Sequence, residues 1–205
     1  MPTLTAEHLI DLLTRYIAES GETIDLLLVG ALALHAYGVP HRANRDVDAE
    51  LQGPLAPLME YLMTHDIPAD LTQNFSGWSV VAMPPGYRDR AIDFIKMPKL
   101  HVRVLSPLDF VIAKLRRGID VDFDDALLVA RHHHISVDSI QTSARAALAA
   151  SPQDTTLFFC SRRRSISFVR ASRHQSRSEC SRTTLRGLFF LSQALQYRRF
   201  ISADQ

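Results

Sequence analysis

Apolar residues recur along this chain with two periods, the 3.6-residue period of an α-helix and the two-residue period of a β-strand. Thr5 is in the position of an N-cap for a first helix, which we expect to end at Ser20 and Gly21. The rest of the pattern predicts strands at 24–29, 46–51, 79–83, 91–97 and 102–105, and helices at 31–37, 55–64, 106–118, 123–132 and 137–150.

These strands alternate with helices irregularly, and several of them have one polar face. This arrangement predicts an α/β (α+β) domain, with a central mixed sheet flanked by helices and a helical C-terminal part, rather than a doubly wound parallel sheet. The chain of 205 residues is long enough for one well-buried domain. Its longest apolar runs are shorter than the about 20 residues of a membrane span, so we expect no membrane association.

The start of the chain has neither the basic segment nor the continuous apolar segment of a signal peptide. Only two cysteines occur, Cys160 and Cys180, which are too few for a disulfide framework or a zinc site. Both features predict a cytoplasmic protein.

Charge divides the chain into two segments, and we predict a boundary near residue 160. Residues 1–150 contain 13 Lys and Arg against 19 Asp and Glu, whereas residues 151–205 contain 10 Arg, no Lys and 3 acidic residues. The predicted organisation is a domain at 1–160 and a Ser/Arg-rich basic segment at 161–205. That segment could bind RNA, could be a disordered tail, or could result from a shifted reading frame. We favour the third interpretation because the composition changes abruptly.

Candidate chemistry centres on Asp46 and Asp48, whose spacing places both carboxylates on one face of a strand. Oxygen ligands of this kind suit Mg²⁺ or Mn²⁺ bound together with substrate phosphates. Asp93, on another predicted strand, is expected to lie alongside them and complete a two-metal site. Gly30 follows a buried strand and opens a short helix, where backbone N–H groups can approach a phosphate. Arg42 and Arg45 flank the acids and either bind phosphate or offset local negative charge. 

Several motifs occur together in one order. They are residues 28–38, with Leu28-Val29-Gly30-Ala31 and Tyr37-Gly38; Arg42 and Asn44 before Asp46-Val47-Asp48; residues 105–109; Lys114-Leu115; Asp122-Phe123-Asp124-Asp125; and residues 151–159. The pattern resembles the polymerase-beta-like nucleotidyltransferase superfamily, over about residues 5–160. It is most similar to the nucleotidyltransferase-like group related to the abortive-infection toxins of bacterial toxin–antitoxin systems.

The resemblance implies a nucleotidyltransferase fold and a role for each matching residue. Gly30 and Ala31 would cradle the triphosphate, and Asp46 and Asp48 would hold the metal. Asp93 would polarise the attacking hydroxyl, and Lys114 would contact nucleotide phosphates. Of the two acidic residues that follow, Asp122 or Asp125 would order Lys114 or assist the base.

The expected function is therefore metal-dependent transfer of a nucleoside monophosphate from an NTP to a hydroxyl on RNA, tRNA or protein. The expected partners are the NTP, the acceptor and a cognate toxin or antitoxin protein. The alternative is a non-catalytic nucleotidyltransferase-fold module that binds a partner, as an antitoxin does. Two features favour this alternative slightly: Ala31 stands in place of a second Gly or Ser, and the composition of the C-terminal segment differs from that of the domain.

Overall fold

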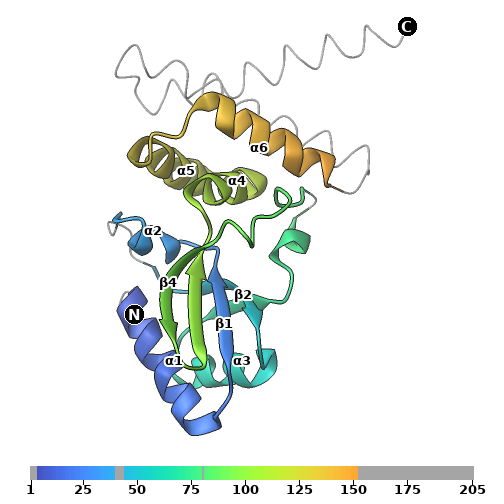
Figure 1. The fold of residues 1–205 in the computed structure, drawn as a ribbon. Helices are drawn as coiled ribbons and strands as arrows, with labels where there is room; N and C mark the ends of the chain where they lie inside the picture. Colours follow the sequence, from blue (N-terminus) through green and yellow to red (C-terminus); the bar gives the residue numbers. More distant parts are fainter. Residues whose placement is uncertain (1–3, 40–43, 80, 152–205) are drawn as a thin grey trace, which may run out of the picture.

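The computed structural model describes residues 4–39, 44–79 and 81–151 (Figure 1). The predicted boundary near residue 160 and the basic segment at 161–205 lie outside them. The elements in chain order are α1 (Ala6–Ser20), β1 (Ile24–Leu28), α2 (Ala33–Ala36), β2 (Val47–Gln52), α3 (Leu55–Thr64), β3 (Ala69–Thr72), the 3₁₀ helix η1 (Phe75–Trp78), β4 (Ile92–Met97), β5 (Leu100–Val104), α4 (Pro107–Arg117), α5 (Asp120–His132) and α6 (Val137–Ala149).

The five strands form one mixed sheet in the order β3-β2-β1-β5-β4. The inner strand β1 pairs antiparallel with β2 and parallel with β5, while β3 runs parallel to β2 and β4 antiparallel to β5. Helices flank this sheet, so the predicted α/β class with a central mixed sheet is confirmed, and the architecture is compatible with a nucleotidyltransferase fold.

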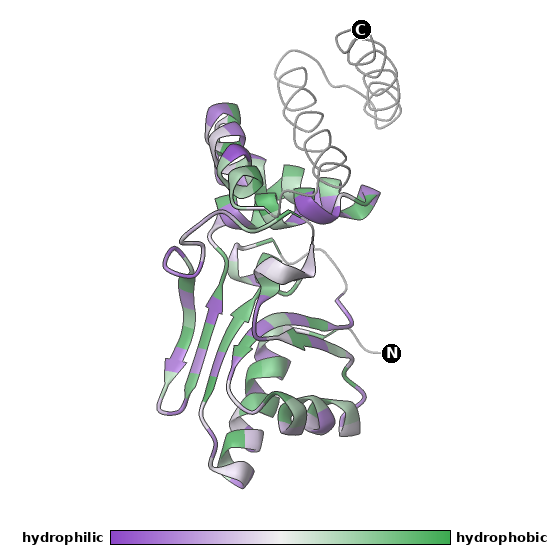
Figure 2. Ribbon diagram, turned by 90° about the vertical axis from the view of Figure 1, so that its right-hand side faces the viewer, coloured by the Kyte–Doolittle hydropathy of each residue, from purple (hydrophilic) through white to green (hydrophobic). Residues whose placement is uncertain are grey.

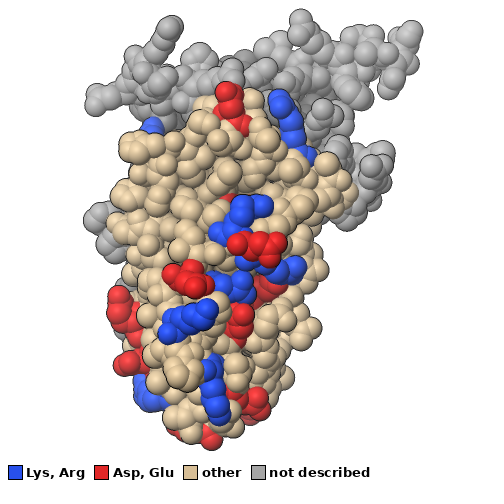
Figure 3. All heavy atoms as spheres, in the orientation of Figure 1, with Lys and Arg blue, Asp and Glu red and all other residues tan. Residues whose placement is uncertain are grey.

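The two faces of the sheet differ in composition. One face carries buried apolar residues, including Ile24, Leu26 and Val102, and α1 and α3 lie on this side (Figure 2). On the other face, β1, β5 and β4 place Asp25, Arg103 and other polar side chains toward solvent. Acidic and basic side chains are accordingly interspersed over this part of the surface (Figure 3). 

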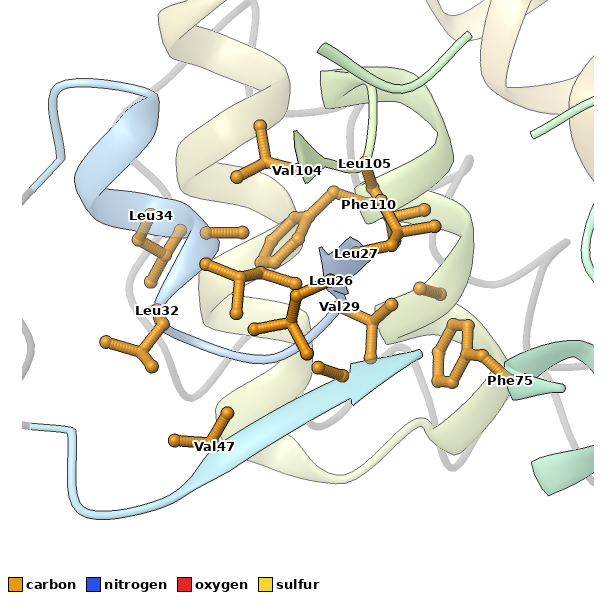
Figure 4. Packing of buried hydrophobic residues seen from close by; sticks show 14 of the residues in the cluster. Leu26, Leu27, Val29, Leu32, Leu34, Val47, Phe75, Val104, Leu105 and Phe110 are labelled. Carbon is orange, nitrogen blue, oxygen red and sulfur yellow. The ribbon is translucent and has the colours of Figure 1, made fainter. Parts of the chain in front are cut away.

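Helices α4, α5 and α6 pack together beyond one end of the sheet (Figure 1). Phe110 of α4 is fully buried and lies among core side chains that include Leu27 and Val104 (Figure 4). This contact fixes the helices to the ends of β1 and β5. Among the residues that the structure describes, no helix is long and apolar enough to cross a membrane.

Local signals set several element ends as predicted. The Thr5 hydroxyl accepts a hydrogen bond from the N–H of His8, and Gly21 ends α1 at a φ of 72°. Helix α4 begins after Ser106, whose side chain accepts from the N–H of Asp109, and ends at Gly118 with a φ of 65°. A left-handed φ of this kind favours glycine, which explains why both helices end where they do.

The prediction of a strand at 79–83 is wrong, because residue 79 and residues 81–83 form no strand. Side chains, rather than a neighbouring strand, satisfy the backbone here: Arg116 donates to the Val81 carbonyl, and the N–H of Met83 donates to Ser76. Val81 and Met83 are buried, so the apolar run reflects core packing of a loop. The strand that the sequence did not predict is β3.

Two helices differ in length from the prediction. The predicted helix at 31–37 is reduced to α2, with Ala31 and Leu32 in a turn before it. Helix α5 begins at Asp120, three residues before the predicted start, so the acidic stretch forms its first turns. Acidic side chains in a first turn are favoured by the partial positive charge at a helix N-terminus.

Candidate functional site

Asp46 and Asp48 lie where β2 begins, next to the turn that follows β1. Asp46 immediately precedes the strand and is exposed, and Asp48, its second residue, is half-buried. Asn44 supports this segment: it is 4% exposed, and its amide donates to the Asp46 carbonyl at 2.7 Å. The neighbouring Arg45 is exposed, and Arg42 lies outside the described residues.

Gly30 packs directly against Asp48. A Cβ atom at position 30 would lie 2.5 Å from Oδ2 of Asp48 and 2.6 Å from its Cβ, so only glycine fits without movement. The N–H groups of Val29 and Gly30 both donate to the Asp48 carbonyl, at 3.0 and 3.2 Å. The observed role of Gly30 is therefore close packing of the β1 turn on Asp48. The cradle for triphosphate predicted at Gly30 and Ala31 stays a prediction.

The environment of Asp48 disfavours its negative charge. Burial raises the pKa of Asp48, and the charges of Asp46 and Asp70 raise it further, while Arg117 and Lys114 partly offset the effect. Among the described residues, the Asp48 carboxylate accepts no hydrogen bond and forms no ion pair. A cation bound nearby would stabilise the ionised form of such a half-buried carboxylate.

Helices α4 and α5 bring Lys114, Asp122 and Asp125 into one buried cluster. The Nζ of Lys114 lies 3.2 Å from Oδ1 of Asp122 and 2.9 Å from Oδ2 of Asp125, and it lies 5.3 Å from the centre of the Phe110 ring. All three charged residues are at most 5% exposed. Both carboxylates thus hold this lysine. Direct contact of Lys114 with nucleotide phosphates stays a prediction.

Arg117 forms hydrogen bonds to this cluster, and sequence analysis did not select it. Its Nε and Nη2 donate to the two carboxylate oxygens of Asp122 at 2.6 and 2.7 Å. This hydrogen bonding is the main cause of the raised pKa of Arg117, to which the charges of Asp48 and Asp46 add. Basic residues in the last turn of a helix are common, so its place in sequence gave no specific signal.

Asp70 is a second residue that sequence analysis missed. It lies on β3, where its Cα is paired with that of Asp48, and its charge raises the pKa of Asp48. Neighbouring strands are about 4.8 Å apart, and side chains at paired positions share a face. The only signal was the alternation in Ala69–Thr72, which is too short to predict a strand by itself.

The structure does not bring Asp93 to the Asp46–Asp48 pair. Asp93 lies on the edge strand β4, which is separated from β2 by β1 and β5. Three strand spacings correspond to about 14 Å. Asp93 instead pairs with His101, whose Nε2 lies 2.7 Å from Oδ1, and this hydrogen bond is the main cause of its lowered pKa. The catalytic role of Asp93 stays a prediction, but Asp93 does not lie alongside Asp46 and Asp48 as predicted.

Within residues 4–39, 44–79 and 81–151, no group of three or more His, Cys, Asp or Glu side chains is arranged to hold a metal ion. The role of Asp46 and Asp48 as metal ligands therefore stays a prediction that rests on two carboxylates. Mg²⁺ is commonly bound in this way, through one or two carboxylates together with phosphate oxygens and water.

Comparison with protein families finds a match. The family model described as "Nucleotidyltransferase of unknown function (DUF6036)" matches residues 7–158. No curated protein and no solved structure matches the chain. The matched range includes the Gly30 turn, β2 and the α4–α5 cluster.

Proposed function

The chain belongs to the nucleotidyltransferase family DUF6036, and from this premise we propose that it is a metal-dependent enzyme that transfers a nucleoside monophosphate from an NTP to a hydroxyl group. The observation that carries the proposal is the environment of the Asp48 carboxylate. Its carboxylate is half-buried, has a raised pKa and lies beside Asp46 against the Gly30 turn. 

A divalent cation fits this donor set. Asp46 and Asp48 would hold Mg²⁺ or Mn²⁺, because carboxylate oxygens suit these ions and because a cation relieves the repulsion between the two acids. When bound, the ion supplies charge neutralisation on the phosphates and lowers the pKa of a bound hydroxyl. No third carboxylate completes this set among the described residues, so the substrate phosphates belong to it.

In the proposed reaction, the acceptor oxygen attacks the α-phosphorus of the NTP. The bond between that phosphorus and the oxygen bridging to the β-phosphate breaks, and pyrophosphate leaves. We assign the acceptor proton to Asp70, because it is paired with Asp48 in the sheet, whereas Asp93 lies three strands from β2. Asp46, Asp48 and the Gly30 turn position the phosphates, and positioning with charge stabilisation accounts for most phosphoryl-transfer catalysis.

For the acceptor, we propose RNA, with tRNA first, and protein second. The support is the sequence resemblance to toxin–antitoxin nucleotidyltransferases, and a cognate toxin or antitoxin partner is proposed on the same basis. The alternative, a non-catalytic module that binds a partner, is an outcome of the experiment below.

The test is label transfer from each of the four α-³²P-labelled NTPs to total RNA or to cell protein, with Mg²⁺ or Mn²⁺. We expect transfer by the wild-type chain, and loss of at least about 100-fold in Asp46→Asn/Asp48→Asn, which removes both proposed metal ligands. Asp11→Asn, an exposed acidic residue of α1, is the matched control.

Two further variants test which acidic residue accepts the proton of the acceptor hydroxyl. Asp70→Asn should lower transfer strongly, while Asp93→Asn should lower it less. Transfer that persists in Asp46→Asn/Asp48→Asn would overturn the catalytic proposal. Wild-type protein that neither transfers label nor binds any NTP with metal would support the non-catalytic module instead.

A further inference from the structure

We propose that the outer edge of β4 is a dimerisation surface, at which the β4 strands of two copies of this chain pair antiparallel about a two-fold axis. Strand β4 is the last in the order β3-β2-β1-β5-β4, and no strand among the described residues pairs with its outer edge (Figure 1). Such an edge presents backbone N–H and C=O groups that another strand can satisfy. The inference does not depend on the proposed enzymatic function.

The side chains of β4 are divided between the two faces of the sheet. Ile92, Ile95 and Met97 are paired with buried apolar residues of β5, on the face toward α1 and α3. Asp93 and Lys96 are paired with polar residues of β5, on the opposite face. A register shift between Asp93 and Ile95, where β4 has one extra residue, maintains this division. The strand therefore has one apolar face and one charged face.

The six residues of β4 are complementary to the same six residues read in the opposite direction. In the antiparallel register centred on the middle of Ile92–Met97, Asp93 of one copy lies opposite Lys96 of the other. Ile92 then lies opposite Met97, so apolar side chains meet on one face and opposite charges meet on the other. Directly opposed residues share a face of a sheet, and both kinds of pair stabilise it. Shifting the strands by one residue in either direction would oppose a charged side chain to an apolar one.

The side chains that this pairing uses are accessible in the single chain. Ile92 is 46% exposed and Met97 is 40% exposed, although both are large and apolar. The side chain of Asp93 is 57% exposed, and His101 contacts its Oδ1, so Oδ2 can receive a second partner. Lys96 is exposed and has no ion-pair partner among the described residues. A second copy would cover both apolar side chains and would pair each lysine with an aspartate.

The competing interpretation is that the extra residue and the lysine protect the edge from pairing, since bulges and lysines are common devices against edge-to-edge association. In that case the chain would stay monomeric at every concentration. In the proposed dimer, by contrast, two five-stranded sheets join into one continuous sheet, and the two-fold axis closes the assembly. Strand order keeps Asp46 and Asp48 three strands from the interface, so both copies keep their candidate sites accessible.

The experiment measures the dimer dissociation constant of the full chain by sedimentation velocity, from about 1 µM to about 200 µM protein. We expect a monomer–dimer equilibrium for the wild type. Lys96→Asp and Asp93→Lys should each raise the dissociation constant by at least about tenfold, because like charges then face each other at both symmetric positions. Arg145→Asp, which changes an exposed arginine of α6, is the matched control and should dimerise as the wild type does.

Mixing the two charge variants tests the register itself. Lys96→Asp has two aspartates in β4 and Asp93→Lys has two lysines, so an equimolar mixture should form a heterodimer in which every opposed pair again has opposite charges. Ile92→Thr/Met97→Thr keeps the charges and should also weaken the dimer, by loss of apolar contact. Thermal unfolding checks that each variant is folded.

Three results would overturn the inference. They are a wild-type chain that stays monomeric up to about 200 µM, a dimer that persists unchanged in Lys96→Asp and Asp93→Lys, and an equimolar mixture that remains monomeric while both variants are folded. If a charge variant does not fold, Ile92→Thr/Met97→Thr decides, and an unchanged dissociation constant in that variant would overturn the inference.

Discussion

Replacing Lys114 with Met should destabilise the protein strongly, because this lysine forms ion pairs with two buried carboxylates. Nζ lies 2.9 Å from Asp125 and 3.2 Å from Asp122, and Lys114 is 4% exposed. Removing one partner of a buried ion pair typically costs about 3–5 kcal/mol. Arg117 still neutralises Asp122 in the variant, so we expect a loss near the lower end, about 3 kcal/mol.

Urea denaturation at pH 7 measures this loss. With an m-value of about 2 kcal/mol per molar urea, a loss of about 3 kcal/mol lowers the midpoint by about 1.5 M. Lys96→Met, which changes an exposed lysine of β4, is the matched control and should stay within about 0.5 kcal/mol of the wild type. A midpoint shift below about 0.5 M for Lys114→Met, with an unchanged m-value, would refute the reasoning.

Two further measurements isolate the electrostatic part of the loss. In Lys114→Met/Asp125→Asn the buried charge is removed together with its partner, so the double variant should be more stable than the two single effects added together. The penalty should also shrink at low pH. The pKa of Asp122 is lowered from 3.8, so its stabilisation is present above 3.8 and disappears as pH falls through the folded-state value.

Two other perturbations follow from the same physical reasoning. Burial and the charge of Asp46 raise the pKa of Asp48 above 3.8, so ionisation of Asp48 destabilises the folded protein as pH rises. Asp48→Asn should therefore raise the free energy of unfolding at pH 7 and give no gain at pH 3. Thermal unfolding at both pH values measures this difference. Burial lowers the pKa of Arg116 to about 10, and its guanidinium donates to three carbonyls within residues 75–81. Arg116→Met leaves those carbonyls without their donor and should cost about 2–4 kcal/mol in urea denaturation, with altered emission from Trp78, the only tryptophan; unchanged stability and emission would contradict this account.

Local sequence patterns determined much of this fold. Thr5, Ser106, Gly21 and Gly118 mark the ends of α1 and α4 because capping and left-handed turns depend on a few adjacent residues. The alternation around Asp46 and Asp48 predicted β2, because the two-residue period of a strand is likewise a local property. Lys114 forms ion pairs with both Asp122 and Asp125, while the catalytic roles that the family resemblance implied for these residues stay predictions.

Other features were decided only by contacts between distant parts of the chain. The run at 79–83 has the composition of a strand, but Arg116 and Ser76 satisfy its backbone, and the core buries its side chains in a loop. A segment becomes a strand only when another strand provides hydrogen bonds, and that partner is not encoded locally. For the same reason, the short β3 was not predicted.

The candidate site shows the same division. The spacing of Asp46 and Asp48 predicted that they share one face of a strand, and the structure places Asp48 in β2 and Asp46 immediately before it. Strand order placed Asp70 next to Asp48 and Asp93 three strands from β2, and helix packing placed Arg117 against Asp122. Residue spacing fixes which side chains share a face of one element, but only the free energy of packing the whole chain decides which elements become neighbours.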